Sequence, residues 1–217
     1  MTLVAVALFS TGPLLMPAGA PATDALPAGA PAAGAPATSA KKKPATSAKK
    51  KPHSCANSNL LPNKINTAAV AAATLCLIDK VRATYHLRPL RSNHELQALA
   101  TTQVGDMVRW NYFADNRPAG QTPATLIEAT RYGAHATRLA TGQNIAWGMG
   151  VYASPARVVT AWMHSPPHRE IILTADFRDA GVSATAAVPS VVENRVPTPV
   201  PASMPGATYA VEFGARG

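Results

Sequence analysis

The sequence predicts an α+β domain in which helices pack around a small, mostly antiparallel sheet. Three observations predict this fold class: helical patterns come first, strand patterns come later, and no strand–helix–strand repeat occurs. The chain has 217 residues, which is enough for one domain with an appendage. This length excludes a large multidomain assembly.

The first 54 residues differ from the rest in composition. Residues 1–22 contain an apolar stretch followed by small residues, which is typical of a cleaved export signal, although no Lys or Arg precedes the stretch. The stretch is too short and too often broken by Gly and Pro to span a bilayer. Residues 23–54 are low in complexity, and we expect a disordered linker because they carry too little apolar surface to fold. The predicted domain therefore covers residues 55–217.

The positive charge of the chain is concentrated in this linker. The formal net charge is +9. Residues 1–54 contribute +5 of it through six Lys and one Asp, and the octet Ala-Thr-Ser-Ala-Lys-Lys-Lys-Pro occurs twice, at 37–44 and 45–52. The arm is either a tether for an anionic polymer or lipid or a solvated spacer, and the spacer is favoured because basic linkers are common. Because the remaining charge is modest, the sequence argues against a nucleic-acid-binding fold.

The chain contains two cysteines, Cys55 and Cys76. Their separation of about 20 residues fits no zinc or redox motif. In an exported protein the simplest interpretation is a disulfide, which would contribute on the order of 3 kcal/mol. The alternative is two unrelated thiols, one of them buried in a helix.

Helices are predicted from start signals and from apolar residues at three- and four-residue steps. Residues 66–86 form the first helix, since alanine is frequent there and apolar residues recur at helical spacing. The segment 92–95 forms a capping box that opens a second helix, which ends near Trp110. A threonine followed by proline opens a short third helix over 122–133.

A further helical region is interrupted by two prolines. Ser154 and Pro155 repeat the start signal of the third helix. Pro166 and Pro167 must end this helix, because proline lacks the N–H that a helix interior needs. One more helical turn is expected over 168–173.

Strands are predicted at 143–148, 181–188 and 208–213, where β-branched or alternating residues are bounded by glycine. The Pro-rich stretch 189–205 is too long for a tight turn. We expect it to be a mobile loop that joins two antiparallel strands.

Several of these segments resemble the bacterial CAP domains, the extracellular relatives of cysteine-rich secretory proteins, antigen 5 and pathogenesis-related 1. The matching segments are Leu75–Arg82 with Leu87–Leu90, Asp106-Met107 with Asn111-Tyr112-Phe113, Gly142–Gly148, Trp162–Arg169 with Ile172-Leu173, Phe177-Arg178 with Gly181-Val182, and Tyr209–Gly214. The resemblance covers about residues 55–217. It implies an α-β-α sandwich that is secreted or held at the cell surface or in the periplasm.

The resemblance also implies a central cavity with two His and two acidic residues that can hold a divalent metal. Of these residues only His168 is unchanged: Asp115 occupies the other His position, and Gln143 replaces the signature Glu. No second acid is evident between residues 113 and 142 except Glu128, whose place on a predicted helix makes it a poor match. We therefore expect a ligand cavity around Asp115, Gln143 and His168. Asp115 and His168 form only a weak candidate pair for zinc.

We expect an exported, monomeric binding domain without catalytic activity, with a cell-wall polymer, an anionic lipid or a small apolar ligand as partner. The first alternative is a divalent-metal-assisted hydrolase or peptidase that uses the same cavity. Ser165 near His168 could serve as a nucleophile, but a serine before two prolines is more often a cap or turn residue. No Gly-x-Ser-x-Gly or His-Glu-x-x-His motif occurs. The second alternative is binding of an anionic polymer through the Lys-rich arm.

Overall fold

The computed structural model describes residues 54–193 and 204–217. The predicted export signal and the predicted linker up to residue 53 lie outside the described residues. The same holds for residues 194–203 of the Pro-rich stretch. Within the described part, no helix is both long enough and apolar enough to cross a membrane.

One sheet with mostly antiparallel pairing forms the centre of the domain, as predicted. Its strands in the described residues follow the order β1 (Arg91–Ser92), β3 (Asp179–Thr185), β4 (Gly206–Arg216) and β2 (Leu139–Met149). β4 pairs antiparallel with both β2 and β3, and the short β1 pairs parallel with β3. β4 is therefore hydrogen-bonded along both of its edges.

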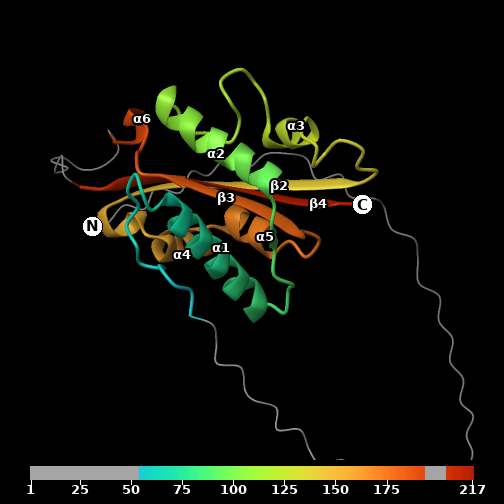
Figure 1. Ribbon diagram of the computed structural model, residues 1–217, viewed down its shortest axis with the longest axis horizontal. Coiled ribbons are helices and arrows are strands. Elements are labelled where there is room, and N and C mark those ends of the chain that lie inside the picture. The colour runs from blue at the N-terminus through green and yellow to red at the C-terminus, as the bar shows by residue number, and fades with distance from the viewer. Residues whose placement is uncertain (1–53, 194–203) are drawn as a thin grey trace, which may run out of the picture. The chain divides into compact units, whose positions relative to one another are not determined.

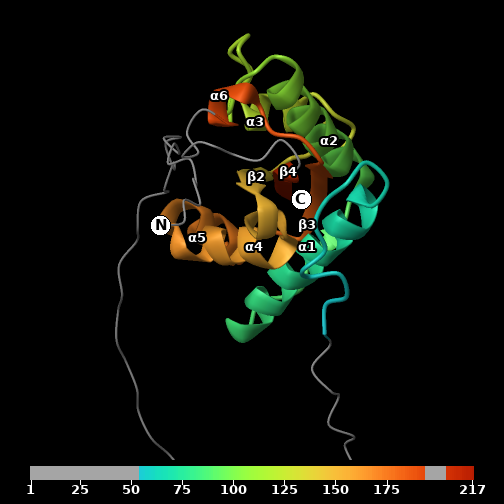
Figure 2. The same ribbon diagram turned by 90° about the vertical axis from the view of Figure 1, so that its left-hand side faces the viewer.

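Helices cover both faces of the sheet (Figures 1 and 2). One layer contains α2 (His94–Arg109) and α3 (Pro123–Glu128). The opposite layer contains α1 (Thr67–Thr84), α4 (Pro155–His164) and α5 (Pro166–Leu173). Figure 2 shows the first layer above the sheet and the second below it. The predicted α-β-α sandwich is confirmed.

Alternation along β4 assigns its side chains to the two layers. Val211 and Phe213 pack in the core that the sheet shares with α1, α4 and α5. Ala210 packs instead against Val104 and Met107 of α2. Because successive strand residues face opposite sides, Glu212 shares the α2 face with Ala210.

The predicted elements differ from the structure mainly at their ends. The third helix ends at Glu128, five residues earlier than predicted, because the Thr130 hydroxyl bonds to the Ile127 carbonyl and offers the backbone an alternative to the helix. β2 begins four residues earlier than predicted. The stretch predicted to be a loop contains the short helix α6 (Ser190–Glu193). The break between α4 and α5 is confirmed, with Pro166 as the first residue of α5.

The predicted disulfide is present between Cys55 and Cys76. It joins the segment before α1 to the middle of α1. A covalent link here restricts the unfolded chain and fixes where the domain begins.

Arg82 connects α1 to the chain that leads from α5 into β3. Its guanidinium is fully buried and donates to four main-chain carbonyls. These acceptors are the carbonyls of Arg88 at 3.0 Å, Ile172 at 2.7 Å, Thr174 at 3.0 Å and Phe177 at 3.3 Å. Arg82 thereby satisfies carbonyls at the end of α5 that no helical N–H can reach.

We predict that Arg82→Met lowers the free energy of unfolding by on the order of 3 kcal/mol, because it leaves these buried carbonyls without a donor. Arg88→Met is the matched control, since the Arg88 side chain is exposed and only its main chain takes part. Urea unfolding followed by circular dichroism measures both variants. Equal losses in the two variants would contradict the assigned role of Arg82.

Candidate functional site

The three residues predicted to share a cavity lie on three different elements. Gln143 lies in β2, His168 lies in α5, and Asp115 lies in the connection between α2 and α3. Gln143 and His168 are buried, whereas Asp115 is partly exposed.

Gln143 is bound to an acidic residue that the sequence reasoning did not select. The register of β2 on β4 places Glu212 directly opposite Gln143. The Gln143 Nε2 donates to Glu212 Oε1 at 2.5 Å, and the two residues are 8% and 2% exposed. Gln143 Oε1 and Glu212 Oε2 are also buried, and neither has a hydrogen-bond partner. The pair is therefore joined by one bond while each residue keeps an unused oxygen.

Burial raises the pKa of Glu212 to about 8. The hydrogen bond from Gln143 and the positive charge of Arg117 oppose this shift, while the negative charge of Asp115 adds to it. At neutral pH Glu212 is thus mostly protonated. The carboxyl accepts from the Gln143 amide nitrogen through Oε1, whereas its Oε2 and the Gln143 amide oxygen make no hydrogen bond with the residues that the structure describes.

Asp115 approaches this pair from the connection after α2. Burial raises the pKa of its carboxyl to about 6. Gln103 of α2 holds the connection in place, since its Nε2 donates to the carbonyls of Ala114 at 3.0 Å and Asp115 at 3.3 Å. Gln103 Oε1 is buried and has no partner. We call Gln103, Asp115, Gln143 and Glu212 the polar cluster.

Arg117 and Asp106 border the polar cluster as an ion pair. Arg117 Nη2 lies 3.4 Å from Asp106 Oδ2, and both side chains are largely buried. The neighbouring Tyr112 hydroxyl is buried without a partner, and burial raises the pKa of Tyr112. Arg117 also acts on the cluster, because its positive charge lowers the pKa of Glu212 and its Nε is buried without a partner among the described residues.

His168 is placed by different contacts in the opposite helix layer. Its Nδ1 lies 2.8 Å from the Ser165 hydroxyl, and its carbonyl accepts from Asn144 Nδ2 at 3.0 Å. Asn144 and Gln143 are consecutive strand residues, so their side chains face opposite sides of the sheet. Within residues 54–193 and 204–217, no hydrogen bond or ion pair joins His168 to Asp115 or Gln143. The structure brings Asp115 and Gln143 together through Glu212, and a cavity shared with His168 stays a prediction.

Ser165 precedes α5 as its N-cap residue, but its side chain caps no backbone N–H. Its hydroxyl contacts the imidazole of His168 instead. Burial lowers the pKa of His168, so this ring is neutral at physiological pH. In the part of the chain that the structure describes, no carboxylate contacts the ring to complete a triad.

The zinc site that the resemblance implies does not fit the residues present. Zinc sites in proteins are built mainly from imidazole and thiolate ligands. The polar cluster offers only carboxyl and amide oxygens. Among the described residues, no three His, Cys, Asp or Glu side chains group closely enough to hold a metal ion. We therefore assign no metal-dependent step to this site.

Sequence reasoning missed Glu212 because its partner is 69 residues away in the chain. A signal was nevertheless available. Glu212 is the one charged residue in the apolar run 207–213, where Val211 and Phe213 flank it. A charged residue in the middle of a buried strand requires a polar partner on the neighbouring strand.

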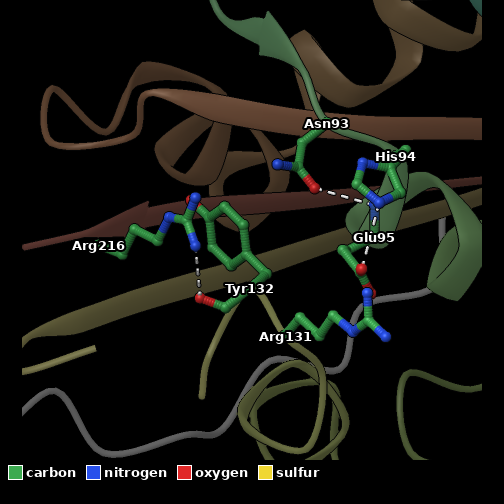
Figure 3. A pocket seen from close by; sticks show the side chains of 6 residues that line it. All are labelled: Asn93, His94, Glu95, Arg131, Tyr132 and Arg216. Carbon is green, nitrogen blue, oxygen red and sulfur yellow. Dashed lines mark hydrogen bonds and ion pairs between the residues drawn. The ribbon is translucent and has the colours of Figure 1, made fainter. Parts of the chain in front are cut away.

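A separate small pocket of about 180 Å³ opens at the start of α2 (Figure 3). Its lining residues are Asn93, His94, Glu95, Arg131, Tyr132 and Arg216. Most of their polar groups contact one another: Asn93 caps α2, His94 pairs with Glu95 at 3.2 Å, and Arg216 lies 4.8 Å above the Tyr132 ring. None of the sequence-predicted site residues lines this pocket.

Comparison with known proteins identifies a family whose profile matches this chain, a related protein and solved structures with a similar fold. The profile of the cysteine-rich secretory protein family, CAP, matches residues 75–187. The uncharacterized protein YkwD of Bacillus subtilis (strain 168) is 30% identical over 127 residues, which are 55% of this chain and 47% of YkwD. The chain thus spans about half the length of this curated relative.

Two solved structures share the fold. An extracellular protein of Bacillus anthracis that contains an SCP domain has a TM-score of 0.51 at 19% identity, over 69% of this chain and 41% of that one. An outer surface protein of Borrelia burgdorferi has a TM-score of 0.50 at 20% identity, over 66% of this chain and 90% of that one. At these identities the likeness shows the fold alone.

We predict that Glu212→Gln removes most of the loss of stability that accompanies a rise from pH 5 to pH 8. Between the ordinary carboxyl pKa of 4.5 and the folded value of about 8, the unfolded chain releases a proton that the folded protein retains. The free energy of unfolding therefore falls by up to about 1.4 kcal/mol per pH unit in this window. The variant should keep only the smaller decline below about pH 6 that Asp115 produces.

Urea unfolding at half-unit pH steps measures this dependence. Glu170→Gln, at an exposed position of α5, is the control and should retain the wild-type slope. Parallel curves for wild type and Glu212→Gln would show that Glu212 ionises normally in the folded protein.

Proposed function

Because the chain belongs to the cysteine-rich secretory protein (CAP) family, we propose that it is an exported, non-catalytic binding domain whose ligand is held by the polar cluster. The single observation that carries this proposal is the buried Gln143–Glu212 pair, in which each side chain keeps an oxygen without a partner. His168 lies in α5 on the opposite side of the sheet and is not included in the proposed site.

Unpartnered buried oxygens are costly, and this cost favours a binding role. A buried polar group without a hydrogen bond destabilises a fold by about 1–3 kcal/mol. Gln103, Gln143 and Glu212 each carry such an oxygen, on three elements that pack together. A ligand that donates hydrogen bonds to them would recover this energy on binding.

The protonation states favour binding over hydrolysis. A general base must accept a proton near neutral pH, but Glu212 already holds one there. Ser165 and His168 are in contact, yet a serine hydrolase also needs a carboxylate that orients the imidazole. Among the residues that the structure describes, none makes that contact.

Three features support export. The first residues have the composition of an export signal. The domain contains a disulfide, which persists in oxidising compartments. Proteins with the same fold are described as extracellular in Bacillus anthracis and as an outer surface protein in Borrelia burgdorferi. A cell-wall polymer is therefore the partner that we expect the domain to meet.

We predict that Gln143→Leu/Glu212→Leu lowers retention of the full chain on isolated bacterial cell walls by about tenfold or more. Replacing both partners by apolar residues of similar shape keeps the packing but removes the hydrogen-bonding groups. Gln97→Leu/Glu128→Leu makes the same changes at exposed positions of α2 and α3 and should bind as wild type does. Co-sedimentation measures bound and free protein. Equal retention of both double variants would overturn the proposed site.

Deletion of residues 37–52 separates the domain from the Lys-rich arm. If the arm is a spacer, the shortened chain keeps its retention and the same dependence on salt. If the arm binds the wall, retention of the shortened chain falls and becomes less sensitive to salt. The reason is that contacts between exposed charges weaken between 0.05 and 0.5 M salt, whereas buried contacts do not. This is expected from a Debye length of about 10 Å at 0.1 M. We expect the first result.

A further inference from the structure

When Glu212 is ionised, the oxygens without partners in the polar cluster are all hydrogen-bond acceptors. They are Gln103 Oε1 from α2, Gln143 Oε1 from β2 and Glu212 Oε2 from β4. α2 packs on β4, and β4 pairs with β2, so the three side chains come from adjoining elements. Once Glu212 is ionised, the cluster therefore lacks donors of its own, and a buried donor without a partner in the described part of the chain, Arg117 Nε, lies at its border.

The charges around Glu212 point to the same deficiency. On β2 it faces Gln143, which is neutral, and its partner on β3 is Gly181, which has no side chain. From the connection after α2, Asp115 adds negative charge, and Arg117, which is paired with Asp106, adds positive charge. In its described residues, the region thus contains three acidic residues, Asp106, Asp115 and Glu212, and one arginine.

We propose that the polar cluster binds a primary ammonium group, which takes the place of the proton on Glu212. This inference rests on the proposed binding function and names the chemical class of its ligand. Upon binding, the Glu212 O–H bond breaks, its proton passes to solvent, and the carboxylate pairs with the ammonium. The ammonium N–H groups donate to the carboxylate and to the amide oxygens of Gln103 and Gln143.

The donor count favours an ammonium over a metal ion. A primary ammonium offers three N–H donors, which equals the number of unpartnered oxygens. A divalent ion needs six or more oxygen ligands or a tight set of charged ones. In the residues described here, no group of three acidic, His or Cys side chains provides that set. The Glu212 carboxylate and the two neutral amide oxygens, which are the unpartnered set, match a single positive charge instead.

Asp115 provides the approach for this cation. It is the partly exposed member of the cluster, so a cation arriving from solvent meets Asp115 before Glu212. Its pKa of about 6 leaves it mostly ionised at neutral pH. Asp115 therefore attracts the cation while Glu212 still holds its proton.

Lysine side chains of peptides and amino sugars whose nitrogen is not acetylated both carry such a group. Calorimetry of the full chain with ethylammonium, lysine amide and glucosamine, in two buffers that differ in ionisation enthalpy, measures affinity and proton release together. We expect binding at pH 7 with release of close to one proton and, for ethylammonium and lysine amide, an affinity that rises by up to tenfold per pH unit up to about pH 8. Whichever of lysine amide and glucosamine binds with the higher affinity identifies the source of the ammonium group.

Glu212→Gln should weaken ethylammonium binding by tenfold or more and abolish the proton release, since the amide carries no charge. Glu170→Gln, on the surface of α5, should leave both quantities unchanged. Absence of binding for all three amines, binding without proton release, or full binding by Glu212→Gln would each overturn the inference. So would equal proton release with calcium or zinc chloride, because the cluster would then be a metal site.

The two proposals can fail separately. If no amine binds but Gln143→Leu/Glu212→Leu still loses cell-wall retention, the cluster binds a ligand of another class. If the amines bind but retention does not change, the ammonium ligand is not part of the wall.

Discussion

The pairing register of β2 on β4 is the constraint on which the site depends. It places Gln143 opposite Glu212 and turns both side chains toward α2. A slip of one residue would move every side chain to the other face of the sheet, so that Glu212 would enter the apolar core with Val211 and Phe213. The register is fixed because both faces of the sheet are buried and because β4 is paired along both edges. A costly buried acid is thus held in one position.

The opposite face of the same strands has a structural role. Asn144 binds the His168 carbonyl, and Trp162 donates to the Ile145 carbonyl at 3.0 Å, so α4 and α5 are held against β2. Arg82 ties the end of α5 to α1 through main-chain carbonyls. The layer of α1, α4 and α5 thus packs against the face of β2 that lies opposite the polar cluster. The polar cluster on the other face can therefore keep unpartnered oxygens without loss of the fold.

The sequence predicted what depends on local signals. Start signals and prolines placed the helices, although α2 is capped by Asn93 and not by Ser92 of the predicted capping box, because Ser92 lies in β1. The even cysteine pair predicted the Cys55–Cys76 disulfide. The segments that resemble CAP domains follow one another in the order of that family, and this order predicted the α-β-α sandwich. Glu212 could not be found in this way, because the family signature directs attention to Gln143 and only the strand register connects the two residues. The signature glutamate is lost at position 143, yet a buried carboxyl remains at the same level of the sheet, supplied by the neighbouring strand.

The central claim is that Glu212, which is bonded to the neutral Gln143, keeps its proton at neutral pH because burial disfavours its charged form. A ¹³C NMR titration of the side-chain carboxyls, with Glu212 assigned by the loss of its signal in Glu212→Gln, tests this claim most directly. The account predicts a midpoint near pH 8 for Glu212. A midpoint near the ordinary value of 4.5 would contradict it, because the carboxylate would then be solvated or paired with a cation of the protein itself.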